Sequence, residues 1–372
     1  MTGAQLKVLA LVTDAFGGVG GIAQYNRDFI QALAADEQII DITIAPRLAP
    51  RPDRTTPPRT RQLRAIKDQI LYSLNALVVA LRTRPDLVFC GHLFMAPLAI
   101  LAGRLTGARV ILQTHGIEVW PRPGRLQAAA IEACDLVLCV SRDTRERLLT
   151  WTRIAPERVL VTPNTVADRF TPGDGRGIRA ALDLNEKVIL LSVSRLDPTQ
   201  QYKGQDRVIG LLGALRARGH DAVFVIGGSG EDSDRLKALA RTEGVADHVR
   251  FVGEVSNDQL LDLYRTADLY LMPSSGEGFG IVFLEAMACG VPAVGLALGG
   301  APDALGRGLG EAVGPSDLLD AIERALVAPR PDATAQNTEV RRRYGRAVFQ
   351  GRVSRLVERL AEPTSATARA PA

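Results

Sequence analysis

The sequence predicts an α/β protein of two Rossmann-like, doubly wound domains, each with a parallel sheet between layers of helices. The chain has 372 residues, which is long for a single hydrophobic core. Short apolar runs alternate with helical segments, as in parallel sheets covered on both faces. The alternation stops once, between Asp168 and Glu186, where proline and glycine accumulate, and then restarts. We therefore expect domains over residues 1–170 and 171–340, a helix over 341–360 and a disordered tail over 361–372.

Composition places the chain among globular proteins without a membrane span. Apolar residues make up 46% and charged residues 23%, and no run of eighteen apolar residues occurs. The amino-terminal apolar run contains Lys7 and leads directly into a strand, so we do not expect a secretory signal. The cysteines lie in apolar runs or helices without C-x-x-C spacing, which favours reduced thiols in a cytoplasmic protein over a zinc site or disulfides. They are Cys90, Cys134, Cys139 and Cys289.

The first half contains six predicted strands. They are Leu6–Val12, Ile40–Pro46, Asp86–Cys90, Arg109–Thr114, Asp135–Val140 and Val159–Pro163. The first strand is followed by the loop Gly17–Gly21 and a helix over Ile22–Ala35. Gly18, Gly20 and Ala23 satisfy the dinucleotide pattern G-x-G-x-x-A, but five residues separate them from the strand. We interpret the loop as anion-binding or acceptor-facing, with Gly18 and Gly20 as candidate donor-binding residues; nicotinamide dinucleotide binding is the alternative.

A histidine lies at the end of the fourth predicted strand. His115 directly follows Arg109–Thr114 and precedes Gly116. Ligands of open parallel sheets bind at the carboxyl ends of the strands. A lone histidine is usually structural, but this position makes His115 a candidate catalytic residue.

A basic segment precedes an apolar helix in the first half. Between Arg47 and Lys67 there are seven basic residues and one acidic residue, Asp53. The basic residues are Arg47, Arg51, Arg54, Arg59, Arg61, Arg64 and Lys67. A predicted helix over Ile70–Leu81 follows, with Arg82 and Arg84 behind it. Two interpretations remain open: a flexible basic loop before a core helix, or a peripheral contact of residues 47–84 with anionic lipid. Nucleic acid is disfavoured because no aromatic residues interleave with the arginines.

The second half repeats the strand–helix pattern. Its predicted strands are Lys187–Val193, Asp221–Ile226, Val249–Gly253, Leu269–Met272 and Ala293–Leu296, and its predicted helices include Asn257–Ala267, Ile281–Cys289, Ser316–Ala328 and Glu339–Leu360. A linker is expected over Pro329–Thr338. Arg195 and Lys203 lie at a strand end and a helix start, where cations would meet a bound anion.

The stretch from Pro273 to Pro292 is predicted to be a glycine-rich turn followed by a helix. The helix start offers backbone N–H groups to a phosphate, and glycines in the turn let a ligand approach the main chain. Glu277 lies in the turn, and Glu285 about one turn inside the helix. A dipole-favoured acid and a solvated helix residue are the plainer alternatives. The apolar surroundings instead favour a buried Glu285, which needs partners such as ligand hydroxyls.

Several motifs of the second half occur together and in order. They are Ser194-Arg195-Leu196, Tyr202-Lys203-Gly204-Gln205, Gly227–Gly230, Phe251–Gly253, and Glu277-Gly-Phe-Gly with Glu285–Pro292. This half resembles the retaining glycosyltransferases of family 4, which have the GT-B fold. The first half resembles them more loosely, through Gly17–Gly21, Thr114–Glu118 and Thr162–Asn164. Asp303 stands where the family commonly has glutamate.

The resemblance implies a fold and a set of residue roles. It implies two Rossmann-like domains facing a cleft, with the last helix crossing back to the first domain. Arg195 and Lys203 would hold the diphosphate of the donor, Glu277 would bind a sugar hydroxyl, and His115 would line the reaction centre. Glu285 would bind the ribose. The further donor-binding candidates are Gly228, Phe279, Gly280, Ile281 and Val282.

The expected activity is retaining transfer of a sugar from a nucleotide donor, GDP-mannose or a UDP-hexose, without a metal or another cofactor. The expected acceptor is a lipid-linked saccharide in exopolysaccharide or glycolipid assembly, at the inner face of the plasma membrane. Two cations and a helix N-terminus can stabilise the leaving diphosphate in place of Mg²⁺. A nucleotide-sugar epimerase of the same fold and a non-catalytic nucleotide- or carbohydrate-binding protein are the alternatives.

Overall fold

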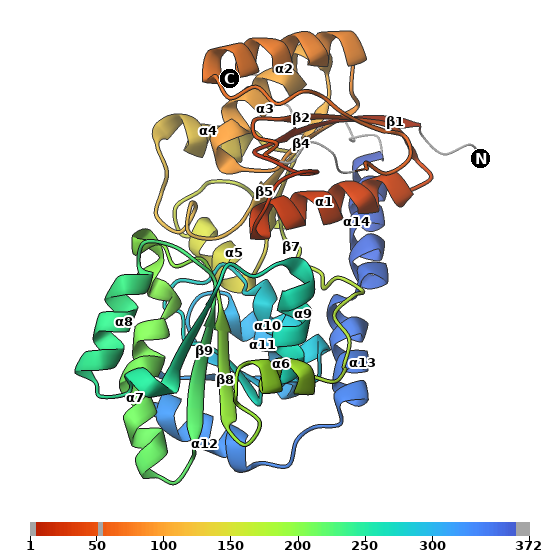
Figure 1. Ribbon diagram of the computed structural model, residues 1–372. Helices are drawn as coiled ribbons and strands as arrows, with labels where there is room; N and C mark the ends of the chain where they lie inside the picture. Colours follow the sequence, from red (N-terminus) through yellow and green to blue (C-terminus); the bar gives the residue numbers. More distant parts are fainter. Residues whose placement is uncertain (1–4, 51–54, 362–372) are drawn as a thin grey trace. The chain divides into compact units, whose positions relative to one another are not determined.

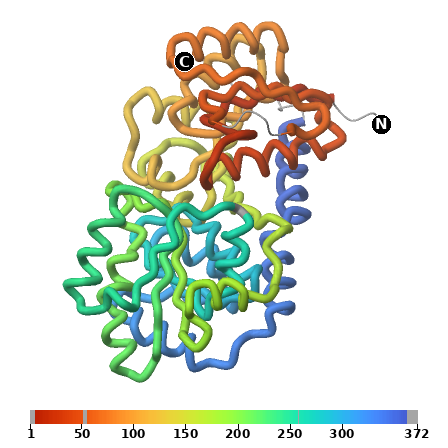
Figure 2. Tube along the Cα trace, in the orientation of Figure 1, coloured from red at the N-terminus to blue at the C-terminus, as the bar shows by residue number. Residues whose placement is uncertain are grey.

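A computed structural model describes residues 5–50 and 55–361. The chain forms two compact units, one of residues 1–165 with 346–372 and the other of residues 166–345 (Figure 1). The chain leaves the first unit once and returns to it with its last helix (Figure 2). Arg51, Arg54 and the tail expected beyond Ala361 lie outside the described residues.

The first unit is built on a parallel sheet. Its described strands pair in the order β3-β2-β1-β4-β5-β6-β7. Their bounds are β1 Leu6–Val12, β2 Ile39–Pro46, β3 Thr60–Gln62, β4 Leu87–Cys90, β5 Arg109–Thr114, β6 Leu136–Cys139 and β7 Val159–Val161. The chain adds β2 and β3 on one side of β1 and then crosses to the other side with β4. The carboxyl ends of β1 and β4 therefore flank the switch point where such sheets bind ligands.

Helices cover both faces of this sheet (Figure 1). Tyr72, Ala76 and Ala80 of α2 pack in one core cluster with residues of α3 and α4. On the other face, Phe29 of α1 stacks on Phe89 of β4 at 4.3 Å and contacts Phe349 of α14. The helices are α1 Gly21–Ala35, α2 Gln69–Thr83, α3 Ala96–Thr106, α4 Arg125–Ala133, α5 Arg142–Leu149 and α14 Arg346–Ala361.

The second unit has the same design. Its described strands pair in parallel in the order β10-β9-β8-β11-β12-β13, so the switch point lies between β8 and β11. The strands are β8 Val188–Val193, β9 Ala222–Gly227, β10 Val249–Gly253, β11 Leu269–Met272, β12 Ala293–Leu296 and β13 Glu311–Val313. The helices are α6 Arg176–Ala181, α7 Gln205–Ala217, α8 Ser233–Thr242, α9 Asn257–Thr266, α10 Ile281–Ala288, α11 Ala301–Leu309, α12 Leu318–Val327 and α13 Ala333–Tyr344.

The basic segment is more ordered than a flexible loop. Thr60–Gln62 form the edge strand β3, paired in parallel with β2. The guanidinium of Arg59 donates to the carbonyl oxygens of Ala34 and Ile39, at 2.6 and 2.8 Å. Arg59 therefore ties this strand to the end of α1, and the flexible-loop interpretation is wrong for this part of the segment.

The helix after the basic segment is not a core helix on every side. Only one face of α2 is buried, through Tyr72, Ala76 and Ala80. Its opposite face exposes large apolar side chains, and we call these the α2 stripe. They are Ile70, Leu71, Leu74, Val78 and Leu81.

The long final helix expected over Glu339–Leu360 is two helices, α13 and α14. Gly345 separates them in an extended conformation with ψ 161°. A Cβ at this position would lie 2.5 Å from the carbonyl oxygen of Arg341, so a larger residue would not fit without a shift. The linker expected up to Thr338 is also shorter, because α13 already begins at Ala333.

Candidate functional site

Three predicted site residues of the second unit follow its central strands. Arg195 comes two residues after β8, Lys203 ends the 3-10 helix η3 Pro198–Lys203, and Glu277 lies in the loop after β11. The Nζ atom of Lys203 lies 2.7 Å from Oε2 of Glu277, and their side chains are 16% and 14% exposed. Arg195, in contrast, is exposed. The loops that follow β8 and β11 therefore carry an ion pair and a further cation.

Backbone contacts hold the loop of Lys203 against the loop of Glu277. The amide of Ser275 donates to the carbonyl oxygen of Tyr202 at 2.8 Å. Gly204 adopts φ 82°, and a Cβ there would lie 2.3 Å from the carbonyl oxygen of Pro273. Glycine is needed at this position both for the left-handed backbone and for the close approach.

A third loop supports Glu277 from the other side. The amide of Gly300 donates to the carbonyl oxygen of Glu277 at 2.7 Å. A Cβ on Gly300 would lie 1.9 Å from the carbonyl oxygen of Gly278. The carboxylate of Glu277 is thus positioned by main-chain contacts on both sides of its loop.

The glycine-rich loop after β9 packs against the segment that carries Arg195. The amide of Leu196 donates to the carbonyl oxygen of Ser229 at 3.0 Å. Gly228 has φ 126°, and a Cβ there would lie 1.8 Å from the carbonyl oxygen of Ser194. Gly228 therefore has a structural reason to be glycine, and its assignment to donor binding stays a prediction.

The start of α10 has no side-chain cap for its backbone amides. Gly280 is its N-cap with φ 91° and provides no side chain to cap the helix. The first-turn amides of Ile281 and Val282 have no acceptor within the helix. Phe279 is buried and its ring contacts the ring of Tyr344. At the other end Gly290 has φ 82°, the left-handed conformation in which a glycine commonly ends a helix.

Glu285 is buried inside α10. Its side chain accepts a hydrogen bond from the hydroxyl of Tyr264 at 2.8 Å, and the residue is 9% exposed. The alternative of a solvated helix residue is therefore wrong. Burial, together with the charge of Glu285, raises the pKa of the Tyr264 hydroxyl well above its usual value. Tyr264 was not predictable as a partner of Glu285, because nothing in the sequence pattern of α9 marks a contact with α10.

Two histidines lie at the strand ends of the first unit. His115 follows β5, and its Nε2 lies 3.0 Å from the carbonyl oxygen of Gly91. Because that oxygen can only accept, Nε2 carries the proton of the neutral ring. Burial lowers the pKa of His115 to about 4, and the same cause lowers the pKa of His92 to about 4. The two rings stack with centroids 6.0 Å apart, so this strand edge carries two neutral imidazoles at pH 7.

The first glycine loop is held from its inner side. The guanidinium of Arg27 donates to the carbonyl oxygens of Ala15 and Gly18, both at 2.8 Å. Gly20 is the N-cap of α1 with φ 96°, and open space surrounds the position that a Cβ would take there. The loop therefore presents its Gly20 side to solvent or a ligand; which ligand it binds stays a prediction.

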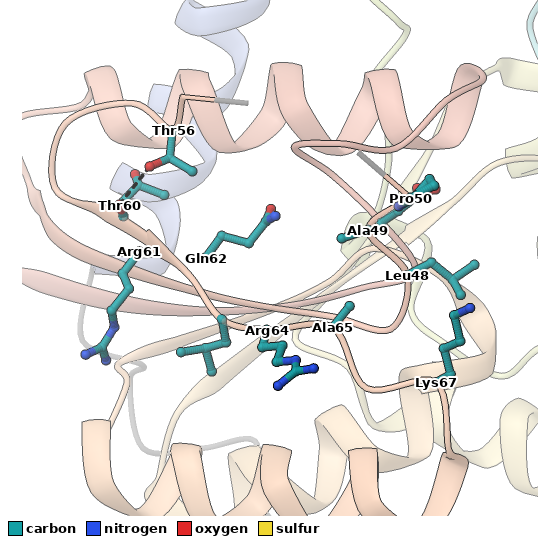
Figure 3. Close-up of a pocket in the computed structure, with 12 residues that line it drawn as sticks. Leu48, Ala49, Pro50, Thr56, Thr60, Arg61, Gln62, Arg64, Ala65 and Lys67 are labelled. Atoms are coloured by element: carbon teal, nitrogen blue, oxygen red, sulfur yellow. Dashed lines mark hydrogen bonds between the residues drawn. The ribbon is translucent and has the colours of Figure 1, made fainter. Parts of the chain in front are cut away.

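A cavity of about 1010 Å³ lies at the edge of the first sheet (Figure 3). Asp14 follows β1, Leu48 follows β2 and Leu63 follows β3, so the cavity lies at the carboxyl ends of these strands. The described residues that line it are Asp14, Leu48, Ala49, Pro50, Thr56, Thr60, Arg61, Gln62, Leu63, Arg64, Ala65 and Lys67. Its polar members Thr56, Thr60 and Gln62 were not predicted as site residues, because no strand was expected within the basic segment.

The described part of the chain offers neither a metal-binding cluster nor a membrane-spanning helix. Among the described residues, no group of three or more histidine, cysteine, aspartate or glutamate side chains could hold a metal ion. No helix within the described ranges is long and apolar enough to cross a membrane. The four cysteines are buried thiols, and burial raises the pKa of Cys90, Cys139 and Cys289 to about 12.

Comparison with protein families matches both halves of the chain. Residues 19–169 match Glycosyltransferase Family 4, and residues 176–344 match Glycosyl transferases group 1. The chain is 33% identical over 320 residues to a GDP-mannose-dependent alpha-(1-6)-phosphatidylinositol monomannoside mannosyltransferase of Mycobacterium tuberculosis, covering 80% of this chain and 82% of that protein. It is 40% identical over 189 residues to a D-inositol 3-phosphate glycosyltransferase of Actinosynnema mirum, covering 47% of this chain and 45% of that protein.

Solved structures share the fold. The crystal structure of Anabaena HepE in complex with UDP and glucose matches with a TM-score of 0.75 at 17% identity, over 95% of this chain and 99% of that one. WaaG, a glycosyltransferase involved in lipopolysaccharide biosynthesis, matches with a TM-score of 0.68 at 18% identity, over 94% of this chain and 99% of that one. Two Rossmann-like units with these neighbours define the GT-B architecture, as predicted.

The chain belongs to glycosyltransferase family 4. Its prediction as a transferase of this family is confirmed, and the alternatives of an epimerase or a non-catalytic binding protein are not needed to explain the matches.

Proposed function

We propose that the protein transfers mannose from GDP-mannose, with retention at the anomeric carbon, to a lipid-linked acceptor that contains an inositol phosphate. The Lys203–Glu277 pair at the β8–β11 switch point is the observation that carries the donor side of this proposal. The relative from Mycobacterium tuberculosis is named for GDP-mannose and for a phosphatidylinositol monomannoside, and the relative from Actinosynnema mirum for inositol 3-phosphate. Both names support a phosphate-bearing acceptor, and the first supports the donor.

The positive charges of the second unit would stabilise the leaving diphosphate. Negative charge grows on the diphosphate as the bond to the sugar breaks. Arg195, Lys203 and the first-turn amides of α10 can meet that charge without moving far, because their loops are fixed by backbone contacts. The proposed reaction therefore needs no metal.

Glu277 would act on the sugar rather than as a free nucleophile. Its carboxylate is held by the ammonium of Lys203, so an attack on carbon would first have to break this pair. A hydrogen bond from a sugar hydroxyl to Glu277 is compatible with the pair. We propose that the donor phosphate accepts the acceptor's proton on the face where the new bond forms, which retains the anomeric configuration. Glu285, already paired with Tyr264, would bind the ribose.

The acceptor side would use neutral and apolar groups of the first unit. His115 can offer its unprotonated Nδ1 to an acceptor hydroxyl, since its pKa lies far below 7. The α2 stripe is exposed to 72% at Ile70, 60% at Leu71 and 57% at Leu74. Basic residues flank it, with Lys67 before the helix and Arg82 and Arg84 at its end. An apolar helix face bordered by cations fits the surface of an anionic bilayer, where a lipid-linked acceptor resides.

The test is an incubation with separate nucleotide sugars, with and without phosphatidylinositol-based acceptors. We expect transfer of mannose from GDP-mannose to the lipid, with an α-linked product by NMR and no loss of activity in EDTA. A β-linked product contradicts retention, and activity that disappears in EDTA and returns with Mg²⁺ contradicts the metal-free mechanism. Conversion of the sugar while it stays on the nucleotide identifies an epimerase, and binding without any product identifies a binding protein.

A further inference from the structure

The cavity at the edge of the first sheet carries a concentration of positive charge. Three of its side chains are cations, and they recur at every third position along the chain as Arg61, Arg64 and Lys67. We propose that this cavity binds the anionic phosphate head group of a membrane lipid, which is the acceptor of the reaction. This inference rests on the proposed function and names the subsite that the acceptor would occupy.

These three cations are available to a ligand. All three are exposed, and Arg61 makes one long hydrogen bond, 3.5 Å, to the hydroxyl of Thr43. Within residues 5–50 and 55–361, none of the three forms an ion pair with a carboxylate. A phosphate would therefore meet cations whose charge no acid of the described chain already neutralises.

The neighbouring basic residues Arg47 and Arg59 bind other parts of the protein instead. Arg59 donates to the backbone carbonyls of Ala34 in α1 and Ile39 in β2. Arg47 donates to the carbonyl oxygen of Lys67 at 3.0 Å, and its guanidinium lies over the ring of Tyr72. In the basic segment, Arg47 and Arg59 therefore bind other parts of the chain, whereas Arg61, Arg64 and Lys67 line the cavity.

The cavity wall is fixed and polar. The side-chain amide of Gln62 donates to the carbonyl oxygen of Phe16 at 2.8 Å, and its oxygen accepts from the Phe16 amide at 3.2 Å. This pair of bonds locks β3 to the loop after β1. Thr56, Thr60 and Arg61 lie at one end of the cavity and Lys67 at the other, with Arg64 between them in the view of Figure 3.

One carboxylate, that of Asp14, also lines the cavity, and its negative charge would oppose the binding of an anion. Asp14 is half-buried, and burial raises the pKa of its carboxyl while the nearby Arg27 lowers it. Arg27 thus offsets part of the charge of Asp14. With three exposed cations against one partly compensated acid, the cavity stays electropositive.

Size and position favour a lipid over free phosphate. A volume of about 1010 Å³ is at the upper end of small-molecule sites and far larger than one phosphate ion. Lys67 lies three residues before Ile70, the first member of the α2 stripe. In a bilayer the phosphates form a layer directly beside the hydrocarbon. A cationic cavity that adjoins an exposed apolar helix matches this order, whereas a free phosphate would leave the stripe without a role.

Calorimetric titration with soluble probes tests the inference without a membrane or a donor. The probes are inorganic phosphate, dihexanoylphosphatidylglycerol and dihexanoylphosphatidylcholine, each below its micelle concentration and at about 50 mM and about 300 mM salt. We expect the anionic lipid to bind at least about 10-fold more tightly than either other probe, with the difference shrinking at high salt. Equal affinity for inorganic phosphate and the anionic lipid would reassign the cavity to free anions and overturn the proposal.

Two triple variants localise the binding. Arg61→Gln, Arg64→Gln and Lys67→Gln together should weaken the anionic lipid at least about 10-fold. The control changes Arg104, Arg122 and Arg153 to Gln, which removes the same charge from exposed positions of the same unit and should bind as the wild type. Arg64→Gln alone serves if the triple variant unfolds.

Donor binding separates failure of this inference from failure of the proposed function. The thermal shift caused by GDP-mannose should be the same in both triple variants and in the wild type. If the cavity variant binds the anionic lipid as the wild type does, the head-group site is wrong, although transferase activity can still be measured. If lipid binds as expected but GDP-mannose gives neither a shift nor a product, the proposed function is wrong and the lipid site stands.

Discussion

The ammonium of Lys203 and the carboxylate of Glu277 form a partly buried pair with 2.7 Å between Nζ and Oε2. Each group offsets the cost of removing the other from water, so neither should be treated as independent. A donor diphosphate would compete with Glu277 for the ammonium. In that state Glu277 would become a stronger acceptor for a sugar hydroxyl. Under the proposed function, the pair would therefore connect diphosphate binding to sugar positioning.

Replacing Glu277 should reduce turnover much more than donor binding. Glu277→Gln keeps the shape of the side chain and removes its charge, while Lys203 stays available to the diphosphate. We expect kcat to fall at least about 100-fold, with the Kd for the nucleotide changed by less than about threefold. Initial rates and calorimetry measure both. Glu243→Gln, an exposed change at the end of α8, is the control. Near wild-type turnover in Glu277→Gln would show that the role assigned to this residue is wrong.

Replacing Lys203 should weaken donor binding. Its effect should not be additive with the effect of replacing Glu277. Lys203→Gln removes a charge from the proposed diphosphate site and leaves Glu277 partly buried without its cation. We expect at least about 10-fold weaker binding of GDP-mannose. In the double variant, the second substitution should lower kcat/KM by a much smaller factor than it does in the wild type, because the Lys203–Glu277 pair is already broken. Strict additivity of the two losses would argue that the residues act separately.

Gly300 offers a test of the backbone support beneath Glu277. Gly300→Ala places a methyl group 1.9 Å from the carbonyl oxygen of Gly278, so one of the two loops must move. We expect a loss of about 1–3 kcal/mol in stability, as for other overpacked sites, and a fall in kcat. Gly210→Ala is the matched control, since the new methyl group would have no atom within 4 Å and the residue is inside α7. Unchanged kcat in Gly300→Ala would mean that the loop position does not matter for catalysis.

The buried His92 and the partly buried His115 should make the first unit sensitive to acid. Burial lowers the pKa of His92 and His115 from 6.5 to about 4. Above pH 6.5 both are neutral in the folded and unfolded chain and contribute nothing. As the pH is lowered from 6.5 to 4, these histidines bind protons in the unfolded chain but stay neutral in the folded unit. The free energy of unfolding therefore falls by at most about 1.4 kcal/mol per pH unit for each histidine.

Urea unfolding followed by tryptophan fluorescence measures this effect, because both tryptophans, Trp120 and Trp151, lie in the first unit. His115→Gln should reduce the slope of stability against pH in this window, whatever its effect on stability at pH ~8. His220→Gln, in the other unit, should leave the slope unchanged. An unchanged slope in His115→Gln would contradict the lowered pKa.

The fold was predictable because its signals are local. Buried parallel strands such as Leu6–Val12 are continuous apolar runs, and the structure gives this strand the predicted bounds. The turn before α10 was predictable for the same reason, since Gly280 and Gly290 mark both ends of one short helix. The edge strand β3 was missed because its three residues, Thr60–Gln62, are polar and only their pairing with β2 defines them.

Contacts between distant segments could not be predicted. The Tyr264 hydroxyl reaches Glu285 across 21 positions, and Gly300 reaches the loop of Glu277 across 23. No sequence periodicity predicts these contacts, because they depend on how α9, α10 and α11 pack against one another. The exposure of the α2 stripe was equally hidden, since a helix that is apolar on most sides is usually buried.

Binding to anionic vesicles is the last prediction, and the contacts of each basic residue decide which of them should be replaced. Arg59 is excluded because its guanidinium donates to backbone carbonyls, so its loss would disturb the fold. Each basic residue near an anionic surface contributes about 1 kcal/mol, and salt screens this contribution. We expect the wild type to sediment with phosphatidylglycerol vesicles at low salt and to stay in solution with phosphatidylcholine vesicles.

Two variants separate charge from apolar contact. Changing Arg61, Arg64 and Lys67 to Gln should leave the protein in the supernatant at all salt concentrations. Changing Leu71 and Leu74 to Ser removes exposed members of the α2 stripe, 60% and 57% exposed, and should weaken binding at high salt, where charge is screened. The Arg104, Arg122 and Arg153 control should sediment as the wild type does. If the wild type does not sediment with anionic vesicles, the proposed membrane contact is wrong. The glycosyltransferase assignment does not depend on this result.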